Sequence, residues 1–378
     1  MDKNKANCFY TKQKKNSSKQ KIRVLHVIHG MGSGGAEKDI MNWYRNIDRN
    51  LIQFDFLIRT NQNFYADEIK KLGGHIYQVP PFPKKIIGNY LETRKIIKTN
   101  ADFYNAIHVH GNTLIYIIPL FLSKRYKIKN RIMHIHSTRS SSEIGNIIHK
   151  INRILIPFLA NYKIACSDDA GKFGFGKKYK IINNGINIKE YHLDKVTIKQ
   201  KFNHEFQIED GSLILGHVGR FLPVKNHRFI LSCYEYISKY RKAALILVGD
   251  GPLKNVIKEQ VQVKHLKNVF FLGERKDIPE LLNYFDMMIF PSFYEGVPLV
   301  PLEAQAAKLK VLCSDKISND VFITKYAKKC SLNDNAKQWA NEVLNFLPVA
   351  INDDIDIKFA MNGYDIKTIT AQLVNIWK

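Results

Sequence analysis

Two successive series of short β-branched segments, each alternating with longer helical patterns, constrain the fold of this chain most strongly. The first series begins at residues 22–28 and the second at residues 213–218. Strands that alternate with helices predict a parallel sheet covered by helices on both faces. A polar stretch at residues 194–207 separates the two series and is expected to connect two domains. The sequence therefore predicts two α/β domains.

The placement of the strands sets the predicted domain boundaries. Further strand candidates lie at 54–58, 106–109, 131–134, 162–165, 180–182, 244–248, 269–272, 287–290 and 311–313. We expect a first domain at 21–195, a second at 196–360, and a C-terminal helix at 361–378 that packs back on the first domain. Residues 1–20 carry positive charge but no apolar run, which indicates a disordered basic tail rather than a signal peptide.

Composition limits the partners of the protein. The 58 Lys and Arg residues against 34 Asp and Glu residues give a formal net charge of +24, which attracts nucleotides, phospholipid head groups or nucleic acid. Five scattered cysteines without a Cys-x-x-Cys pair indicate neither disulfides nor zinc, so we expect the protein to be located in the reducing cytoplasm. No apolar run approaches the roughly 20 residues that cross a bilayer.

A glycine-rich loop follows the first predicted strand. Residues 29–37 read His-Gly-Met-Gly-Ser-Gly-Gly-Ala-Glu, and backbone N–H groups at the start of the next helix can bind phosphate there. The letters also fit the dinucleotide pattern Gly-x-Gly-x-x-Gly. Residues 59–61, Arg-Thr-Asn, lack the acidic residue that binds ribose in such sites. Phosphate or sugar contact at Gly34 and Gly35 is favoured over a purely structural turn and over NAD binding.

Four segments of the second half form an ordered set of motifs. They are Gly-His-Val-Gly-Arg-Phe-Leu-Pro-Val-Lys-Asn-His at 216–227, Val-Gly-Asp-Gly-Pro at 248–252, Phe-Leu-Gly at 271–273 and Glu-Gly-Val-Pro-Leu-Val-Pro-Leu-Glu-Ala at 295–304. Together they resemble the retaining glycosyltransferases of family 4, and in particular the branch that builds bacterial capsular polysaccharides and exopolysaccharides. The resemblance implies the GT-B fold, in which two Rossmann-like domains with parallel sheets face a central cleft.

The spacing of Glu295 and Glu303 matches the E-x7-E motif of that family, in which the first glutamate contacts the donor sugar and the second binds the ribose hydroxyls. A carboxylate accepts hydrogen bonds from two hydroxyl groups at once. The resemblance places the donor contacts at Gly273, Glu295, Gly296, Val297, Pro298, Leu299 and Glu303. In isolation, two glutamates at this interval are more typical of a solvated helix face. Ala-Lys-Leu-Lys at 307–310 replaces the Ala-Gly-Leu-Pro turn usual in the family, so an irregular loop is expected there.

Arg220 and Lys225 align with the family residues that bind the donor diphosphate. Fixed cations stabilise the negative charge that grows on the phosphate oxygens as nucleoside diphosphate departs. They can replace a divalent cation, so we expect activity without a metal ion and no cofactor besides the nucleotide-sugar substrate. The single Asp-x-Asp string, at 354–356, lies beyond the predicted second sheet and is expected on the surface.

Histidine pairs end two predicted strands of the first domain, at 108–110 and 134–136. The resemblance assigns to His110 the contact with the reacting sugar, and His136 is the second candidate for that role. A lone histidine at a strand end is more often structural, and neither spacing nor a nearby carboxylate supports a zinc site. Asn184 matches a family loop that lines the cleft near the donor, although its simplest interpretation is a turn.

The resemblance implies transfer with retention from a nucleotide-diphosphate sugar, most often a UDP-sugar in this family, to a lipid-linked saccharide. Residues 84–98 mix bases with apolar residues and fit either an interfacial helix or a solvated face. With a lipid-linked acceptor, this region and residues 144–159 are expected to lie against the anionic inner leaflet of a bacterial membrane. One alternative is a nucleotide-sugar 2-epimerase of the same fold, against which the E-x7-E motif argues. The other is a nucleic-acid-binding protein, but zinc-finger spacing and RNP-like aromatic motifs are absent, so no nucleic acid is expected.

Overall fold

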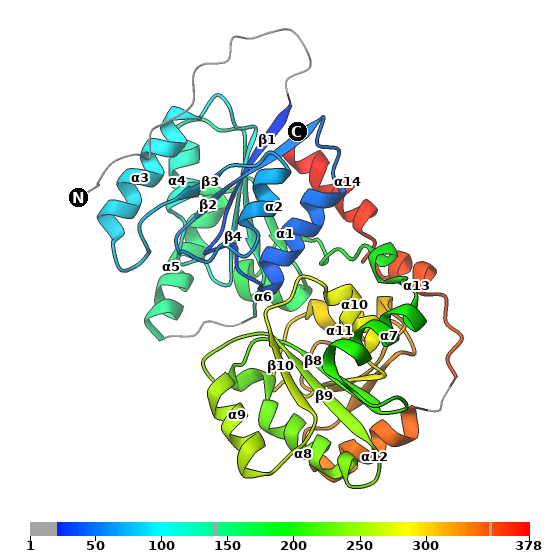
Figure 1. Cartoon of the computed structure of the whole chain (residues 1–378). Coiled ribbons are helices and arrows are strands. Elements are labelled where there is room, and N and C mark those ends of the chain that lie inside the picture. Colours follow the sequence, from blue (N-terminus) through cyan, green and yellow to red (C-terminus); the bar gives the residue numbers. More distant parts are fainter. Residues whose placement is uncertain (1–20, 139–142, 348–349) are drawn as a thin grey trace, which may run out of the picture.

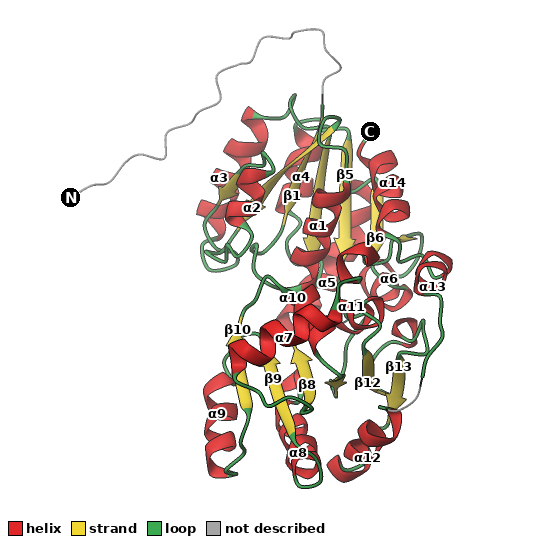
Figure 2. Ribbon diagram, turned by 45° about the vertical axis from the view of Figure 1, so that its right-hand side comes forward, coloured by secondary structure: helices red, strands yellow, loops and turns green. Residues whose placement is uncertain are grey.

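The computed structural model describes residues 21–138, 143–347 and 350–378, and the prediction of a disordered tail at 1–20 lies outside them. The chain forms two α/β domains, each built on one parallel sheet (Figure 1). Figure 2 shows the two sheets one above the other, with helices around each. This architecture agrees with the predicted fold class.

The first sheet has seven strands among the described residues, in the order β3-β2-β1-β4-β5-β6-β7. They are β1 (Ile22–Val27), β2 (Ile52–Ile58), β3 (Ile76–Gln78), β4 (Ala106–Gly111), β5 (Asn130–Ile135), β6 (Tyr162–Ala165) and β7 (Lys180–Ile181). All pairs are parallel. The three-residue edge strand β3 was not predicted, because it is too short to produce a periodic pattern.

The second sheet repeats this plan within the described ranges, with six strands in the order β10-β9-β8-β11-β12-β13. They are β8 (Leu213–Val218), β9 (Ala243–Val248), β10 (Val269–Gly273), β11 (Met287–Phe290), β12 (Lys310–Ser314) and β13 (Ala327–Cys330). In each sheet the first strand lies at the centre, and the strand order reverses beside it. This reversal, between β1 and β4 and between β8 and β11, is where open α/β sheets bind ligands.

Helices cover both faces of the first sheet. They are α1 (Gly35–Asn46), α2 (Ala66–Lys71), α3 (Ile86–Thr99), α4 (Ile118–Arg125), α5 (Glu143–Leu159) and α6 (Asp168–Phe175). Apolar residues of α1 and α2 enter one core, and those of α3 to α6 enter another. Parallel strands need this cover because both of their faces carry apolar side chains, as the wholly buried β2 does. In the described part of the chain, no helix is long and apolar enough to cross a membrane.

The second domain is enclosed in the same way. Its helices are η2 (Pro223–Lys225), α8 (His227–Ser238), α9 (Lys254–Val263), α10 (Ile278–Tyr284), α11 (Leu299–Ala306), η3 (Asn319–Val321), α12 (Ala336–Phe346) and α13 (Ile355–Met361). Asp354 caps α13 by accepting a hydrogen bond from the Ile357 amide at 3.0 Å. Asp354 and Asp356 are both exposed, as predicted for the Asp-x-Asp string.

The prediction of a connecting segment at 194–207 is wrong. After η1 (Ile188–Tyr191), the chain forms the helix α7 (Lys195–Phe206). Ile198 and Phe202 of α7 are buried in the core of the second domain. The sequence of this segment is mostly polar because α7 buries only a narrow apolar stripe that includes these two residues.

The chain then returns from the second domain to the first. The helix α14 (Ile366–Trp377) packs beside α1, and its apolar residues join the core on that face of the first sheet. The fully buried indole of Trp377 donates its Nε1–H to Nδ1 of His108 at 3.3 Å. The amide of Ile186 bonds to the carbonyl of Tyr364 at 2.9 Å, which fixes the start of this return.

The turn after α11 corrects the expectation of an irregular loop. The amide of Lys308 bonds to the carbonyl of Gln305 at 3.0 Å, and the amide of Leu309 bonds to that of Ala304 at 2.8 Å. This pair of bonds is a Schellman motif, which needs a left-handed residue after the helix. Lys308 supplies it with φ of 54°. The lysine thus adopts the conformation that glycine adopts more readily.

Lys308→Gly is expected to raise the free energy of unfolding by about 0.5 kcal/mol, because relief of the left-handed strain exceeds the added entropy of the unfolded chain. Urea denaturation measures the change. Lys258→Gly, at an exposed position in α9, is the matched control and should lower the same quantity by about 1 kcal/mol. A loss of stability in Lys308→Gly would contradict the assignment of strain.

Candidate active site

The two domains meet where the strand orders reverse. Lys38 of α1 contacts Glu303 of α11, with 2.6 Å between Nζ and Oε1. Ser33, in the glycine-rich loop, contacts Glu274, which follows β10. The amide of Asn184 donates to the carbonyl of Val297 at 3.1 Å. The loops at the carboxyl ends of both sheets therefore face one another across a single cleft.

Arg220 and Lys225 lie after β8, and Glu295 lies after the neighbouring strand β11. The Lys225 ammonium is 2.6 Å from Oε1 of Glu295 and 4.6 Å from the centroid of the Phe290 ring. The Phe293 amide bonds to the Val224 carbonyl at 2.9 Å, which joins the two loops. Arg220 is exposed and has no ion pair within the described residues. The site thus keeps one cation compensated and one open to an anion.

Glu303 is fully buried, although it carries a carboxylate. Lys38 compensates it from the opposite domain, and the Lys38 side chain is 18% exposed. A carboxylate removed from water is tolerated only when it is paired or hydrogen-bonded. The second glutamate of the motif is therefore an interdomain contact in this structure.

The entrance to α11 holds the remaining predicted donor contacts of this segment. Pro298 is the N-cap of α11, and Val297 and Leu299 on either side of it are buried. A Cβ added at Gly296 would meet no atom within 4 Å. Packing therefore does not require glycine at 296, and the missing side chain leaves space beside Glu295.

The glycine-rich loop of the first domain ends at the start of α1. Gly34 is the N-cap of α1 and Gly35 its first residue. The carboxyl group of Glu37 lies against Gly34, where a Cβ would stand. Burial raises the pKa of Glu37 to about 7, and the charge of Arg220 from the second domain opposes that shift. This loop therefore faces the cation that follows β8.

Gly273 and Asn184 have structural roles that the sequence did not reveal. Gly273 has φ of 69°, and its carbonyl accepts a hydrogen bond from the Gly249 amide at 2.7 Å. It ends the edge strand β10, away from the strand reversal, so its backbone shapes the loop that reaches Ser33. The side-chain amide nitrogen of Asn184 donates its hydrogen bond to the Val297 carbonyl. The predictions of donor contact at Gly273 and Asn184 stay predictions.

Five histidines share one face of the first sheet, in register on neighbouring strands. They are His26, His108, His110, His134 and His136. Nδ1 of His26 lies 2.9 Å from Nε2 of His110, and Nδ1 of His110 lies 2.9 Å from Nε2 of His136. Trp43 of α1 stacks on His108 and His134, with ring centroids 5.8 Å apart in each pair. The cluster thus lies beneath α1 and α14.

His110 is 3% exposed and both of its ring nitrogens are hydrogen-bonded to other histidines. Contact with a sugar would require it to break one of these bonds, so the predicted role of His110 stays a prediction. His136 is the more exposed of the two candidates. Burial lowers the pKa of His26 to about 3 and that of His136 to about 4. The cluster is therefore uncharged at neutral pH.

Two groups of three histidines in the described residues have ligand atoms within 4.8 Å of one another. They are His26 with His108 and His110, and His110 with His134 and His136. The spacing argument against zinc missed this proximity because the residues come from three strands. Within the described residues neither group includes a carboxylate, and burial of a dication without an anion is costly. The expectation that no metal binds stays a prediction.

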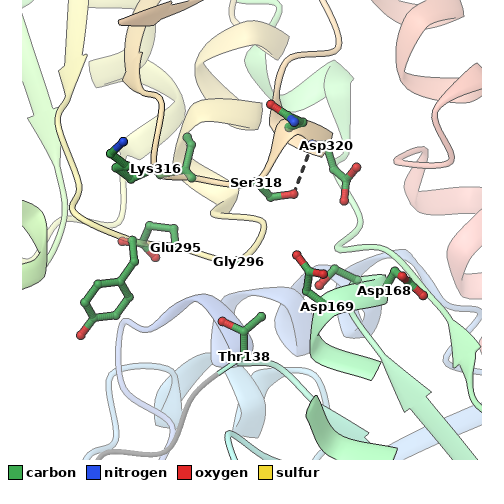
Figure 3. Close-up of a pocket in the computed structure, with 12 residues that line it drawn as sticks. Thr138, Asp168, Asp169, Glu295, Gly296, Lys316, Ser318 and Asp320 are labelled. Atoms are coloured by element: carbon green, nitrogen blue, oxygen red, sulfur yellow. Dashed lines mark hydrogen bonds between the residues drawn. The ribbon is translucent and has the colours of Figure 1, made fainter. Parts of the chain in front are cut away.

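A pocket of about 640 Å³ opens beside Glu295 (Figure 3). Its lining comes from both domains: Thr138, Ser167, Asp168, Asp169, Tyr294, Glu295, Gly296, Lys316, Ile317, Ser318, Asn319 and Asp320. Figure 3 shows Thr138, Asp168 and Asp169 across from Glu295 and Gly296. The lining has four carboxylates and one ammonium group, so the pocket would repel a phosphate. The carboxylates can instead accept hydrogen bonds from hydroxyl groups.

Several residues at the cleft were not singled out from the sequence. Glu37 ends the glycine-rich segment 29–37 and Lys38 follows it, so the signal available in the sequence was their position at the start of the helix α1. Asp168 and Asp169 begin α6, after the sixth strand of the first sheet. Their proximity to Glu295 depends on how the domains meet, which no local pattern encodes.

The fold is that of a two-domain α/β protein whose two Rossmann-like sheets face each other at their strand reversals (Figure 2). The family model described as "Glycosyl transferases group 1" matches residues 198–348. "Putative glycosyltransferase EpsF" of Bacillus subtilis (strain 168) is 33% identical over 380 residues, covering 96% of this chain and 97% of that protein. The chain therefore belongs to the group 1 glycosyltransferases.

Further relatives agree with this assignment. "Capsular polysaccharide biosynthesis glycosyltransferase CapH" of Staphylococcus aureus is 25% identical over 383 residues, covering 94% of this chain and 98% of that protein. "UDP-Gal:alpha-D-GlcNAc-diphosphoundecaprenol alpha-1,3-galactosyltransferase" of Escherichia coli is 30% identical over 153 residues, covering 39% of each. The epimerase and nucleic-acid alternatives receive no support from these relatives.

A solved structure confirms the fold. Anabaena Alr3699/HepE in complex with UDP and glucose superposes with a TM-score of 0.73 at 18% identity, covering 94% of this chain and 98% of that chain. Similarity at this level of identity supports the two-domain architecture alone.

Acidification from pH 6.5 to 5 is expected to destabilise the protein. Histidine has a pKa near 6.5 in an unfolded chain, so the unfolded state binds more protons in this window than the buried cluster does. Stability is complete above pH 6.5 and is lost as the pH falls toward the low folded values of His26 and His136. Melting temperatures measured between pH 7.5 and 5 test this.

His134→Leu removes one of these buried rings and should flatten the pH dependence, by at most about 1.4 kcal/mol per pH unit. His204→Gln, at an exposed position, is the control and should keep the wild-type slope. Equal melting temperatures at pH 7 and pH 5 in the wild type would contradict the neutral cluster.

Lys38→Met is expected to lower the free energy of unfolding by about 3 kcal/mol, because it leaves the buried Glu303 carboxylate unpaired. Urea unfolding measures the loss. The double variant Lys38→Met/Glu303→Gln removes that charge and should recover most of the stability. If Lys38→Met unfolds like the wild type, the two residues are not paired in solution.

Proposed function

We propose that this glycosyltransferase moves a hexose or N-acetylhexosamine from a nucleotide-diphosphate sugar, a UDP-sugar, to a lipid-linked saccharide. Transfer proceeds with retention and without a metal ion, in the synthesis of a cell-surface polysaccharide on the cytoplasmic side of the membrane. The observation that carries the proposal is the pair of cationic side chains, Arg220 and Lys225, beside Glu295. Glu295 in turn lines a pocket whose carboxylates suit hydroxyl groups.

The donor occupies two chemically distinct regions in this proposal. The diphosphate lies between Arg220 and Lys225 on one side and the start of α1 on the other, where backbone amides can bind phosphate oxygens. Glu37, with its pKa raised to about 7, donates a hydrogen bond to phosphate when protonated and so avoids charge repulsion. The sugar lies at Glu295 and Gly296, and the ribose hydroxyls meet Glu303 beside Lys38.

The reaction is a displacement on one face of the sugar. The acceptor hydroxyl oxygen forms a bond to the anomeric carbon as the bond from that carbon to the diphosphate oxygen breaks. The acceptor proton passes to the departing phosphate, and Arg220 and Lys225 stabilise the charge that develops there. Glu295 is held by Lys225, which suits it to orient the sugar hydroxyls rather than to act as a nucleophile.

Relatives support the choice of substrates. The Escherichia coli galactosyltransferase takes a UDP-sugar and a diphosphoundecaprenol-linked acceptor by its name, and CapH belongs to capsular polysaccharide biosynthesis by its name. The acidic pocket supports a saccharide rather than a phosphate at the acceptor side of the cleft. Its carboxylates at Asp168, Asp169 and Asp320 offer acceptors to several hydroxyl groups.

Arg220→Gln is expected to reduce the rate of UDP release about 100-fold, because it removes a fixed cation that stabilises the leaving group. The assay follows nucleoside diphosphate released from a panel of nucleotide sugars, in EDTA, with a membrane extract as acceptor. Arg241→Gln is the matched control. Arg241 is exposed just before β9, at the amino ends of the strands of the same sheet, whereas Arg220 follows the carboxyl end of β8.

The wild type and Arg241→Gln should release UDP at equal rates in EDTA. Turnover that requires added Mg²⁺ or Mn²⁺ would overturn metal independence, and wild-type rates in Arg220→Gln would overturn the diphosphate site. NMR of the product reports the anomeric configuration, and inversion would contradict retention.

A further inference from the structure

The helix α5 turns its apolar side toward solvent. Seven large apolar residues, each between 38% and 72% exposed, occupy the outward face: Ile144, Ile147, Ile148, Ile151, Ile154, Leu155 and Phe158. We call this set the α5 stripe. Their spacing of three and four residues places them on one side of the helix. An ordinary surface helix would bury such a stripe in the core.

Hydrogen bonds fix α5 in this orientation. His149, on the inward face, accepts from the Leu114 amide through Nδ1 at 3.1 Å, and its Nε2 lies 3.0 Å from the Phe173 carbonyl. Asn152, one turn further along, donates to the Leu114 carbonyl at 2.6 Å. Rotation of the helix to bury the α5 stripe would break all three bonds. The exposed apolar face is therefore a built feature of the domain.

Neighbouring helices extend this surface. Ile86, Ile87 and Leu91 of α3 are exposed, as is Phe121 of α4. Lys124 of α4 donates to the carbonyl of Phe158, which joins α4 to the end of α5 at 2.7 Å. The three helices lie over the same core of the first sheet (Figure 1).

The same surface is strongly basic. Residues 84–98, α4 and α5 together contain nine Lys or Arg residues against two glutamates. Lys150 and Arg153 lie within the outer face of α5 itself. Apolar side chains flanked by bases are the pattern of a helix that lies in the interface of an anionic bilayer.

We propose that α3, α4 and α5 form a docking surface for an anionic lipid bilayer, with the α5 stripe inserted among the head groups. Charge favours this occupant over a second copy of the chain, because two copies would bring basic surfaces together. The 17 residues of α5 are too few to span a bilayer, so the helix would lie along the surface. This proposal does not depend on the proposed enzymatic function.

Docking would also place the cleft at the membrane. Thr138 lines the pocket beside Glu295, and α5 begins at Glu143. A lipid-linked saccharide held in the bilayer could then reach the pocket without leaving the membrane.

The test uses the full chain and vesicles of phosphatidylcholine, with or without 30 mol% phosphatidylglycerol, in the absence of nucleotide and saccharide. We expect the wild type to cosediment with the anionic vesicles, and Ile147→Gln/Ile154→Gln to partition at least tenfold less. The control Val263→Gln/Met361→Gln replaces two residues of similar exposure in the second domain and should bind like the wild type. Melting temperatures confirm that each variant is folded.

A second measurement tests insertion directly. All three tryptophans of the chain are fully buried, so Ile154→Trp adds a single surface reporter. Bromine-labelled lipid should quench its fluorescence, and should not quench the added residue of Val263→Trp. Failure of the wild type to bind anionic vesicles, or equal binding by the α5 variant, would overturn the proposal. A dimer in solution that Ile147→Gln/Ile154→Gln dissociates, without vesicle binding by the wild type, would assign the surface to a second copy instead.

Discussion

A parallel sheet must be covered on both faces, and the rest of this structure depends on that constraint. Each crossover helix covers one face of the sheet. A chain that builds the sheet outward from a central strand must therefore place its helices on the other face when it returns to the centre and builds in the opposite direction. At that point the loops after β1 and β4, and those after β8 and β11, diverge to opposite faces of their sheets and leave a gap between them. Arg220, Lys225 and Glu295 reach the same space because these gaps face one another. The order of the strands thus determines where these three side chains lie.

Local patterns predicted the fold well where strands are long and apolar. The central strands of both sheets were found from their β-branched runs, and the resemblance supplied the GT-B arrangement. The strands β3 and β13 and the helix α7 were not predicted. The strand β3 is shorter than any period, β13 has two lysines at its centre, and α7 is mostly polar. In each case tertiary packing decided the structure, through burial of Ile198 and Phe202 for α7.

The site divides in the same way. Arg220, Lys225 and Glu295 belong to motifs within single loops, so the sequence could nominate them. Lys38 could not be paired with Glu303 from the sequence, because the contact joins two domains across 264 intervening positions. The histidine cluster also escaped, since it needs the lateral register of β1, β4 and β5. Sequence identifies groups by type, whereas their partners depend on packing.

The net charge of +24 says little about the cleft itself. Lys38 and Lys225 are each neutralised by a glutamate, and the pocket beside Glu295 is lined mainly by carboxylates. Most of the excess positive charge lies elsewhere, with a concentration on the face of α3, α4 and α5. Within the described residues, Arg220 is a cation of the cleft that no carboxylate pairs with, so local pairing rather than net charge decides where an anion would be attracted.

The return of α14 to the first domain has a consequence for how the protein is made. Trp377 and the apolar residues of α14 complete a core that also contains Trp43, which is synthesised more than 300 residues before Trp377. On the ribosome, the second domain emerges in full before that core can close. The first domain must therefore wait with part of one face of its sheet uncovered, beside α1, until α14 has been made.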